Sequence, residues 1–497
     1  MAIDTKGAAW SKHSTLYELP KALLGGTAAM RAEGQTYLSK GSAEPQGDYD
    51  YRLANTFLTD SYKRTLNYLT GQVFKKEPAL DQAASADIVA WSEDVDRKGN
   101  NLAVFAQKAF RAGLDAGVVF IYSDYSSVKT VDTESGPMFE DKDGTLRPRT
   151  LAAAREQGWG PYWVLVQADQ VIDAWFDTVD GRPTLIHFRY LESVEEQKDE
   201  WTREIVEQVR VLSRGSWEVY RKKTGADGKQ SWDLHSSGVT TMPEIPISDF
   251  IPGEPLTEYT AQPALMGLAE LCLQHWQSSS GHRSMMDWLR RPIVFGKCLS
   301  HEDGFILPAA PGVGLHSTDQ NADIKAVNVI PTDAVTSSAA DLQALETKMG
   351  LYGLQLMMPR SGNVTASQIR RESAESDSAL QRWAGAFQDT LENALHYTAL
   401  WLGEQDGPAI TVNTDFDDML DDVEANVIML AVDKGIISKQ LAFETLKRRG
   451  LISTDQEWEE MRAQVENDQR QVQPVLGAQA AASALLGQRS GQAQGTP

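Results

Sequence analysis

The sequence contains little cysteine: its 497 residues include two, Cys272 and Cys298. Two thiols cannot build a disulfide framework in a chain of this size, and these two are not spaced as a C-x-x-C pair. We therefore expect both to be buried, as small hydrophobic side chains of a protein made in a reducing, cytoplasmic environment. A chain this long has room for two or three domains or subdomains, each with its own hydrophobic core.

Long hydrophobic runs are also absent. The longest apolar stretches, residues 114–122 and 427–432, are far shorter than the roughly 20 residues that cross a bilayer. Residues 1–20 contain neither an apolar segment of secretory length nor an Ala-x-Ala cleavage pattern. The sequence predicts a soluble protein with no membrane partner.

Basic residues are outnumbered by acidic ones. The chain has 47 Lys and Arg against 69 Asp and Glu, a formal net charge of -22. This excess argues against a protein that wraps nucleic acid tightly, because phosphate binding needs clustered basic side chains. It still allows DNA to pass close by, because an acidic wall repels phosphate and a duplex can slide past it. The alternative, that the acidity only keeps a large particle soluble, stays open.

Motifs for catalysis are missing as well. The sequence has no G-x-x-x-x-G-K-S/T phosphate loop, no G-x-S-x-G elbow and no H-E-x-x-H motif. Two pairs, Cys272 with His275 and Cys298 with His301, have the number of ligands that a zinc site needs. The first pair lies inside a predicted long helix and the second beyond its end, so we interpret both as coincidence. We expect no cofactor, no metal and no enzymatic activity.

An acidic cluster is the other candidate metal site. It comprises Asp415, Asp417, Asp418, Asp421, Asp422 and Glu424. Converging carboxylates suit Mg²⁺ or Ca²⁺, but the spacing of a calcium loop fails, because Leu420 stands where Gly is required and Asn426 where Glu is required. A solvated turn before a helix is the preferred interpretation, since acids favour a helix N-terminus.

Periodicity predicts helices and then strands in the first half of the chain. Apolar residues recur at helical spacing within residues 51–74 and 101–114, and residues 118–122 form a β-branched and aromatic run typical of a buried strand. The period then drops towards two in the runs 162–166, 171–176, 183–190, 204–212 and 217–221. Turn signals at 180–181, 214–215 and 227–228 separate some of these runs. Strands this close in sequence predict an antiparallel meander and exclude a Rossmann-type sheet.

The most distinctive part of the chain spans residues 263–403. Its pattern predicts a helix over 263–289, short strands over 293–297, 304–307 and 324–330, a helix over 338–356 and a long helix over 365–402. A capping box at Thr365 and Gln368 begins the last helix and Gly403 ends it. At about 1.5 Å per residue this helix exceeds roughly 50 Å. Further helices are predicted over 423–432, 438–447 and 457–464, and a flexible tail over 472–497.

Four stretches together resemble a known family. They are Tyr37-Leu38 with residues 51–78, ending in Gly71-Gln72-Val73-Phe74-Lys75-Lys76-Glu77-Pro78; residues 105–125, ending in Ile121-Tyr122-Ser123-Asp124-Tyr125; residues 265–296, with Leu268-Ala269-Glu270-Leu271 and Arg291-Pro292-Ile293-Val294; and Val412-Asn413-Thr414-Asp415-Phe416. In their order and spacing the chain resembles tailed-bacteriophage portal proteins, particularly the portal-like family whose domain was formerly of unknown function.

The resemblance implies an α+β portal fold, mainly helical, with the antiparallel meander in a wing and two long stem helices lining a central channel. It implies a wing over 1–255, a first stem helix over 256–289, a clip over 290–333, a second stem helix over 334–356, a tunnel loop over 357–364, a long helix and return to the wing over 365–425, crown helices over 426–471 and a flexible tail over 472–497.

The resemblance also implies function and partners. Portals form a dodecameric homo-oligomer at one capsid vertex of the virion, assembled in the host cytoplasm, through which double-stranded DNA is packaged and ejected. The implied partners are the terminase large subunit, a head–tail adaptor, and major capsid and scaffold proteins. The DNA-facing tunnel loop would be Met357, Met358, Pro359, Arg360, Ser361, Gly362 and Asn363. Arg290, Arg291, Lys297 and Lys325 would face the motor and adaptor from the clip, although four scattered cations also fit a solvated rim.

Arg360 stands out within the loop, because one arginine per chain becomes a ring of charge when identical copies form a ring. The alternative, that Arg360 is an ordinary exposed loop residue, stays open. Two alternatives remain for the whole chain. One is another head–tail connector or minor capsid structural protein. The other is a metal-dependent nuclease that uses the acids of residues 415–424 to hold a water-activating Mg²⁺.

Overall fold

The computed structural model describes residues 3–126, 130–133, 136–140, 146–148, 158–179, 181–224, 230–240, 242–290, 293–297, 320–327, 331–350, 366–414, 416, 432, 434, 438–448, 458–459 and 461–462. These residues fall into two units, Met1–Thr414 and Asp415–Pro497, and each is described by itself.

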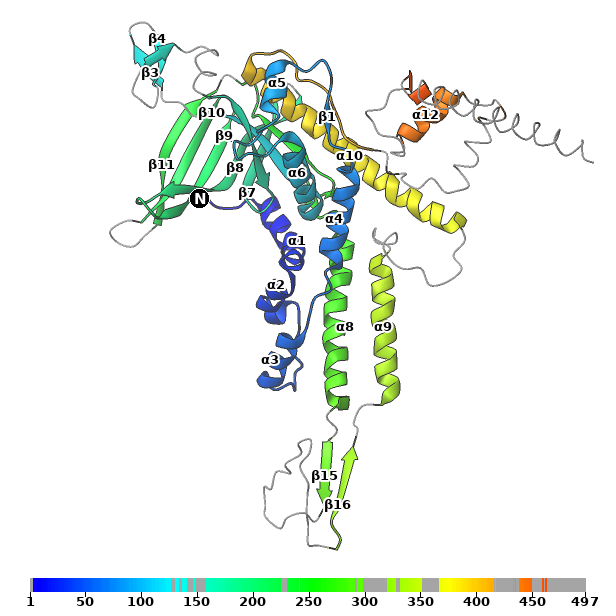
Figure 1. Ribbon diagram of the computed structural model, residues 1–497. Coiled ribbons are helices and arrows are strands. Elements are labelled where there is room, and N and C mark those ends of the chain that lie inside the picture. The colour runs from blue at the N-terminus through cyan, green and yellow to red at the C-terminus, as the bar shows by residue number, and fades with distance from the viewer. Residues whose placement is uncertain are drawn as a thin grey trace, which may run out of the picture. The chain divides into compact units, whose positions relative to one another are not determined.

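The N-terminal part of the first unit is helical (Figure 1). Its helices are α1 (Ala8–Leu24), α2 (Gly26–Ala32), η1 (Gly34–Thr36), α3 (Gln46–Asn55), α4 (Ser61–Val73), α5 (Ala86–Trp91) and α6 (Leu102–Ala116). The helix predicted within 51–74 is confirmed over α4, but the segment is not a single helix, because α3 ends at Asn55 and α4 begins at Ser61. Thr56 is extended, with φ -84° and ψ 134°, and its Oγ1 lies 3.0 Å from Ser280 Oγ. A contact distant in sequence therefore favours the break.

Helix α6 confirms the helix predicted over 101–114. The side chain of Asn101 caps its start by accepting a hydrogen bond from the Val104 N–H at 2.9 Å. The helix ends at Gly117, whose φ is +81° and where a Cβ would lie 2.5 Å from the Gln262 carbonyl oxygen. Both the left-handed backbone and the close approach require glycine at this position.

A five-stranded antiparallel sheet confirms the predicted meander. Its order is β11-β10-β9-β8-β7, with β7 Val171–Val179, β8 Arg182–Gln197, β9 Arg203–Ser213, β10 Ser216–Thr224 and β11 Gln230–Val239. Gly181 and Gly215 adopt φ values of 79° and 77° at two of the predicted turns, a conformation that suits tight hairpins. The third predicted turn, 227–228, lies outside the described residues.

The strand predicted over 162–166 belongs to a different sheet. It forms β6 (Pro161–Gln167), which lies with β12 (Ile247–Phe250) on either side of β2 (Val119–Tyr125) in a three-stranded antiparallel sheet. Its assignment to the meander is wrong, because alternation predicts a strand without specifying its partner. Burial decides the partner: Trp163 is 1% exposed, and its Nε1 donates to Thr398 Oγ1 at 2.9 Å.

Strand β2 is the centre of the first unit, because both of its faces are buried. Phe120 and Tyr122 join a cluster with Phe188 and Tyr190 of the meander. On the opposite face, Ser123 Oγ donates to the Ala394 carbonyl of a long helix. Burial on both faces explains why residues 118–122 form a continuous run of apolar and aromatic residues rather than an alternating one.

The remaining short strands form small sheets of two or three strands. They are β1 (Ala79–Leu80) with β17 (Ile410–Thr411), β13 (Glu254–Pro255) with β14 (Ala261–Gln262), and a sheet of β3 (Thr130–Thr133), β4 (Gly136–Glu140) and β5 (Leu146–Pro148). In the second unit, α12 (Lys439–Arg448) confirms the helix predicted over 438–447. Residues 458, 459, 461 and 462 are helical as predicted, whereas the prediction over 423–432, apart from residue 432, and the tail 472–497 lie outside the described residues.

Helices and antiparallel sheets together confirm the predicted α+β class. In the part of the chain that the structure describes, no helix combines the length and the apolar character that spanning a membrane requires.

Candidate functional site

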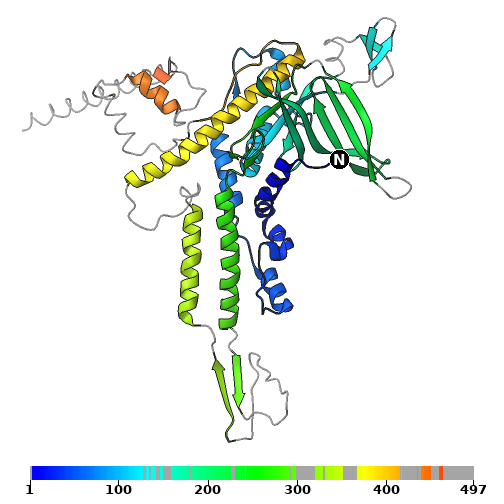
Figure 2. The same cartoon turned by 180° about the vertical axis from the view of Figure 1, so that it is seen from behind.

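Two long helices lie side by side in the first unit. Helices α8 (Met266–Arg290) and α9 (Thr332–Gly350) are neighbours in both views (Figure 1, Figure 2). The helix predicted over 263–289 is confirmed. The second begins at Thr332, earlier than the predicted residue 338, directly after Pro331, a residue that favours helix starts. Residues 351–356 of that prediction lie outside the described residues.

Three side-chain contacts join α8 to α9. His282 Nδ1 lies 3.1 Å from Ser338 Oγ, His275 Nε2 lies 3.4 Å from Glu346 Oε1, and Cys272 Sγ lies 3.7 Å from Met349 Sδ. Along this series of three contacts, the α8 residue lies closer and closer to the start of α8, and the α9 residue lies closer and closer to the end of α9. The two helices are therefore antiparallel, and their contact is a single narrow seam.

Cys272 is buried and free, as the sequence predicted. Desolvation raises the pKa of its thiol to about 12, so the thiol stays protonated at neutral pH. His275 points to Glu346 across the seam, and Cys298 and His301 lie outside the described residues. Among the residues that the structure describes, no group of His, Cys, Asp and Glu is arranged to hold a metal ion.

Away from the seam, α9 is open to solvent. Leu345, Met349 and Gly350 are its buried residues, and the rest of the described helix is exposed or half-buried. The exposed residues are small or polar, namely Asp333, Thr336, Ser337, Ala339, Ala340, Asp341, Gln343, Ala344, Glu346, Thr347 and Lys348. A helix with one narrow apolar stripe does not occupy a core; its open face suits a water-filled space.

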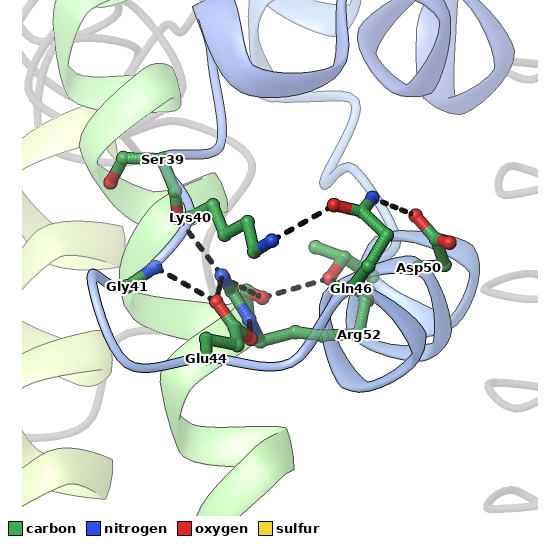
Figure 3. Close-up of polar contacts among 9 residues, drawn as sticks. Ser39, Lys40, Gly41, Glu44, Gln46, Asp50 and Arg52 are labelled. Carbon is green, nitrogen blue, oxygen red and sulfur yellow. Dashed lines mark hydrogen bonds and ion pairs between the residues drawn. The ribbon is translucent and has the colours of Figure 1, made fainter.

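Helix α3 contacts α8 on another side (Figure 3). Arg52 of α3 forms a two-pronged pair with Glu44, Nε to Oε1 and Nη2 to Oε2, both at 2.8 Å. Its Nη2 also donates to the Ser39 carbonyl, and its Nη1 lies 3.3 Å from Ser280 Oγ of α8. Hydrogen bonding from Arg52 lowers the pKa of Glu44 to about 2. Both charges of the pair are thus held next to α8.

A third helix, α10 (Ala366–Leu402), confirms the long helix predicted over 365–402. Its predicted apolar stripe is buried in the core: Leu380, Phe387, Leu391, Ala394 and Leu395 are at most 3% exposed. Trp383 is half-buried, and its Nε1 donates to the Pro252 carbonyl at 2.9 Å. Gly403 follows the helix with φ +82°, as predicted for its stop. The stripe anchors the C-terminal two-thirds of α10 on the central sheet.

A two-stranded ribbon, β15 (Ile293–Lys297) with β16 (Asp323–Val327), connects α8 to α9 along the chain. It confirms the strand predicted over 293–297 and most of the one over 324–330. Residues 304–307 lie outside the described residues.

The structure brings two of the four predicted cations together on this ribbon. Lys297 pairs in register with Asp323, and Lys325 Nζ lies 3.5 Å from Asp323 Oδ2. Alternation places all three side chains on one face. Arg290, at the end of α8, is 65% exposed, with Nη1 3.8 Å from Asp287 Oδ1. Arg291 lies outside the described residues, and so do all seven tunnel-loop residues and the six acids of the candidate metal site.

A small polar cavity lies between residues 81–88 and 404–409, with a volume of about 250 Å³. Asp81, Ser85, Glu404 and Asp406 contribute its polar side chains, and Ser85 Oγ donates to Glu404 Oε1 at 2.7 Å. Its lining holds three carboxylates and one serine, and no histidine, cysteine or lysine. We assign no chemistry to it.

Comparisons with known proteins place α8 to α10 within one matched region. The family described as "Domain of unknown function (DUF4055)" matches residues 264–402. No curated protein sequence matches the chain.

Several solved structures are distantly similar. A chain in "Neck of empty GTA particle computed with C6 symmetry" is 11% identical, with 82% of this chain and 95% of that chain covered and a TM-score of 0.40. A chain in "Neck of native GTA particle computed with C12 symmetry" is 11% identical, with 78% and 89% covered and a TM-score of 0.39. A chain in "Virion of native gene transfer agent (GTA) particle" is 12% identical, with 82% and 95% covered and a TM-score of 0.39.

Proposed function

We propose that the chain is a phage-type portal protein, a ring-forming subunit that makes a channel for double-stranded DNA and has no catalytic role. The observation that carries the proposal is the α8–α9 pair. Its two helices run antiparallel, meet along one narrow seam, and leave the other faces of α9 small, polar and open. One of the four stretches that carry the sequence resemblance to portal proteins, residues 265–296, includes α8.

A ring of copies explains this open face. At about 1.5 Å per residue, the 25 residues of α8 span about 37 Å. Repeated around an axis, helices of this length form a continuous wall. Helix α9 carries three acids and one lysine, so the wall would have weak negative charge. Such a surface repels phosphate rather than gripping it, which suits a duplex that must move.

The other elements take their roles from this arrangement. Helices α8 and α9 are the stem, and residues 290–333, with Arg290, Arg291, Lys297 and Lys325, are the clip that meets the terminase and then the head–tail adaptor. Residues 357–364 are the tunnel loop, α10 leads from the channel back to the wing formed by residues 1–255, and residues 426–471 are the crown. The ring is a dodecamer at one capsid vertex.

Electron microscopy of the purified, full-length chain tests the proposal. We expect top views of rings with a central hole, and a native mass equal to about twelve chains. A compact monomer at all concentrations would overturn the proposal. A ring whose central hole is too narrow to admit a DNA duplex would favour the alternative, another connector component.

A further inference from the structure

The turn between β8 and β9 displays an exposed tryptophan on a hydrogen-bonded backbone. Trp201 is 87% exposed. The Asp199 carboxylate accepts the backbone N–H groups of Trp201 and Thr202 at 2.9 and 2.8 Å, and the Lys198 N–H donates to the Thr202 carbonyl at 3.0 Å. We call residues 198–202 the acidic tip. Its backbone is held before any partner arrives, which lowers the entropy lost on binding.

The charges around the acidic tip are only partly matched. Lys198 pairs with Glu204 and Arg203 with Glu195, so the two cations at the base of the turn are already occupied. Among the described residues, Asp199 and Glu200 have no basic partner. The acidic tip therefore presents an indole ring beside two unneutralised carboxylates.

A second exposed patch has the opposite charge. Phe57, in the segment between α3 and α4, is 58% exposed, with the Arg31 guanidinium 4.8 Å and the Arg283 guanidinium 5.8 Å from its ring centre. Arg31 is held by hydrogen bonds from Nε and Nη2 to the Thr56 carbonyl. Neither arginine has an acidic partner among the described residues. We call these three residues the basic patch.

The two surfaces are chemically complementary. Each consists of one exposed aromatic ring flanked by two unneutralised charges, negative at the acidic tip and positive at the basic patch. The acidic tip and the basic patch of one chain do not bind each other, since Trp201 and Phe57 both remain exposed. Tryptophan and arginine are also the residues most often found at the energetic centres of protein interfaces.

We infer that the acidic tip of one copy docks on the basic patch of a neighbouring copy, with Trp201 against Phe57 and Arg283 and with Glu200 facing Arg283. The inference rests on the proposed ring. Two different surfaces of the same chain make a head-to-tail contact, which generates a closed ring where the rotation between copies closes and an open filament where it does not, but not a two-fold dimer. A stable interface buries about 1,200–2,000 Å², so this contact is an anchor within a wider one.

The test uses full-length protein and measures assembly by mass photometry across a concentration series. Trp201→Ala should raise the concentration for half-maximal assembly by about tenfold or more. Glu200→Arg and Arg283→Glu should each weaken assembly by placing like charges opposite each other. Added salt should then disfavour assembly less than it does for the wild type, because it screens a repulsion at this contact instead of an attraction. Glu93→Arg, the same charge change at another exposed site, is the matched control and should assemble as the wild type does.

A mixing experiment separates contact between copies from an effect within one copy. An equimolar mixture of Glu200→Arg and Arg283→Glu chains restores opposite charges at every junction of an alternating ring, so it should assemble where neither variant does alone. No recovery on mixing, or normal assembly of both single variants beside a ring-forming wild type, overturns this inference and leaves the portal proposal standing. A wild type that never assembles overturns both.

Discussion

Arg210 of β9 donates through Nη1 to Asp124 Oδ2 of β2 at 3.0 Å, and this ion pair ties the meander to the central sheet. The two side chains are 15% and 11% exposed. Arg210 Nε also lies 3.2 Å from Glu192 Oε2, and the Tyr162 hydroxyl donates to Asp124 Oδ2 at 2.8 Å. Every charge in this nearly buried group therefore has a partner.

Replacing Arg210 by leucine should destabilise the first unit by about 3–5 kcal/mol, because it leaves Asp124 and Glu192 buried without their cation. Chemical denaturation followed by circular dichroism measures the loss. The exposed pair Arg203–Glu195, 73% and 61% exposed, is the control, and Arg203→Leu should cost less than about 1 kcal/mol. Equal effects of the two substitutions would contradict this account.

Asp115 should make stability depend on pH. It is 3% exposed, and burial raises its pKa above the ordinary 3.8, opposed by hydrogen bonds from Tyr17 and Tyr62. The folded state therefore holds this proton more tightly than the unfolded state, so its stability falls as pH rises from 3.8 through the raised pKa. In the Asp115→Asn variant, folding stability should no longer show this part of its decrease with rising pH. Urea unfolding at a series of pH values measures it, and parallel curves for the two proteins would refute it.

The Glu44–Arg52 pair should act in the opposite direction. The pKa of Glu44 falls from 4.5 to about 2 in the folded state, so its contribution is present above 4.5 and disappears as pH falls towards 2. Because the Arg52 and Glu44 side chains are still 17% and 19% exposed, water screens the pair, and we expect Glu44→Gln to destabilise the protein by about 1 kcal/mol at neutral pH. Thermal unfolding at neutral pH and near pH 2 checks this, and the two proteins should differ only at neutral pH.

Two glycines should respond oppositely to alanine. Gly117→Ala places a Cβ 2.5 Å from the Gln262 carbonyl oxygen at a φ of +81°, so it should destabilise the protein by more than about 1 kcal/mol. Gly385 lies inside α10, and a Cβ added there would have no neighbouring atom within 4 Å outside its own helix backbone. Gly385→Ala should therefore stabilise the protein by up to about 1 kcal/mol. Denaturant midpoints of both variants decide the matter; a stabilising Gly117→Ala would be incompatible with this geometry.

Arg360→Ala tests the tunnel-loop assignment made from the sequence. The substitution should leave ring assembly intact, because the stem and core carry the fold, while it lowers the yield of packaged DNA by removing one charge per subunit from the channel. Ring formation by electron microscopy and genome content of the particles are the two measurements. A normal genome yield would count against the assignment.

Sequence periodicity predicted the local elements well where a segment is long or strongly patterned. The stripe from Leu380 to Leu395 is a helical face in the sequence and is buried as one in α10. The hairpin turns at Gly181 and Gly215 were also predicted from the sequence, because tight turns need a residue that adopts positive φ. Helix α1 was missed, since its buried residues Trp10, His13 and Leu23 lie among polar ones with a weak pattern.

By itself the sequence determined the strongly patterned helices and strands, because those depend on neighbours within a few residues along the chain. The tertiary structure decided which of them meet. It assigned β6 to β2 rather than to the meander, broke the helix at Thr56 beside Ser280, and gathered Arg31, Phe57 and Arg283 into one patch. These outcomes depend on burial and charge between residues distant in sequence, for which a local pattern contains no signal.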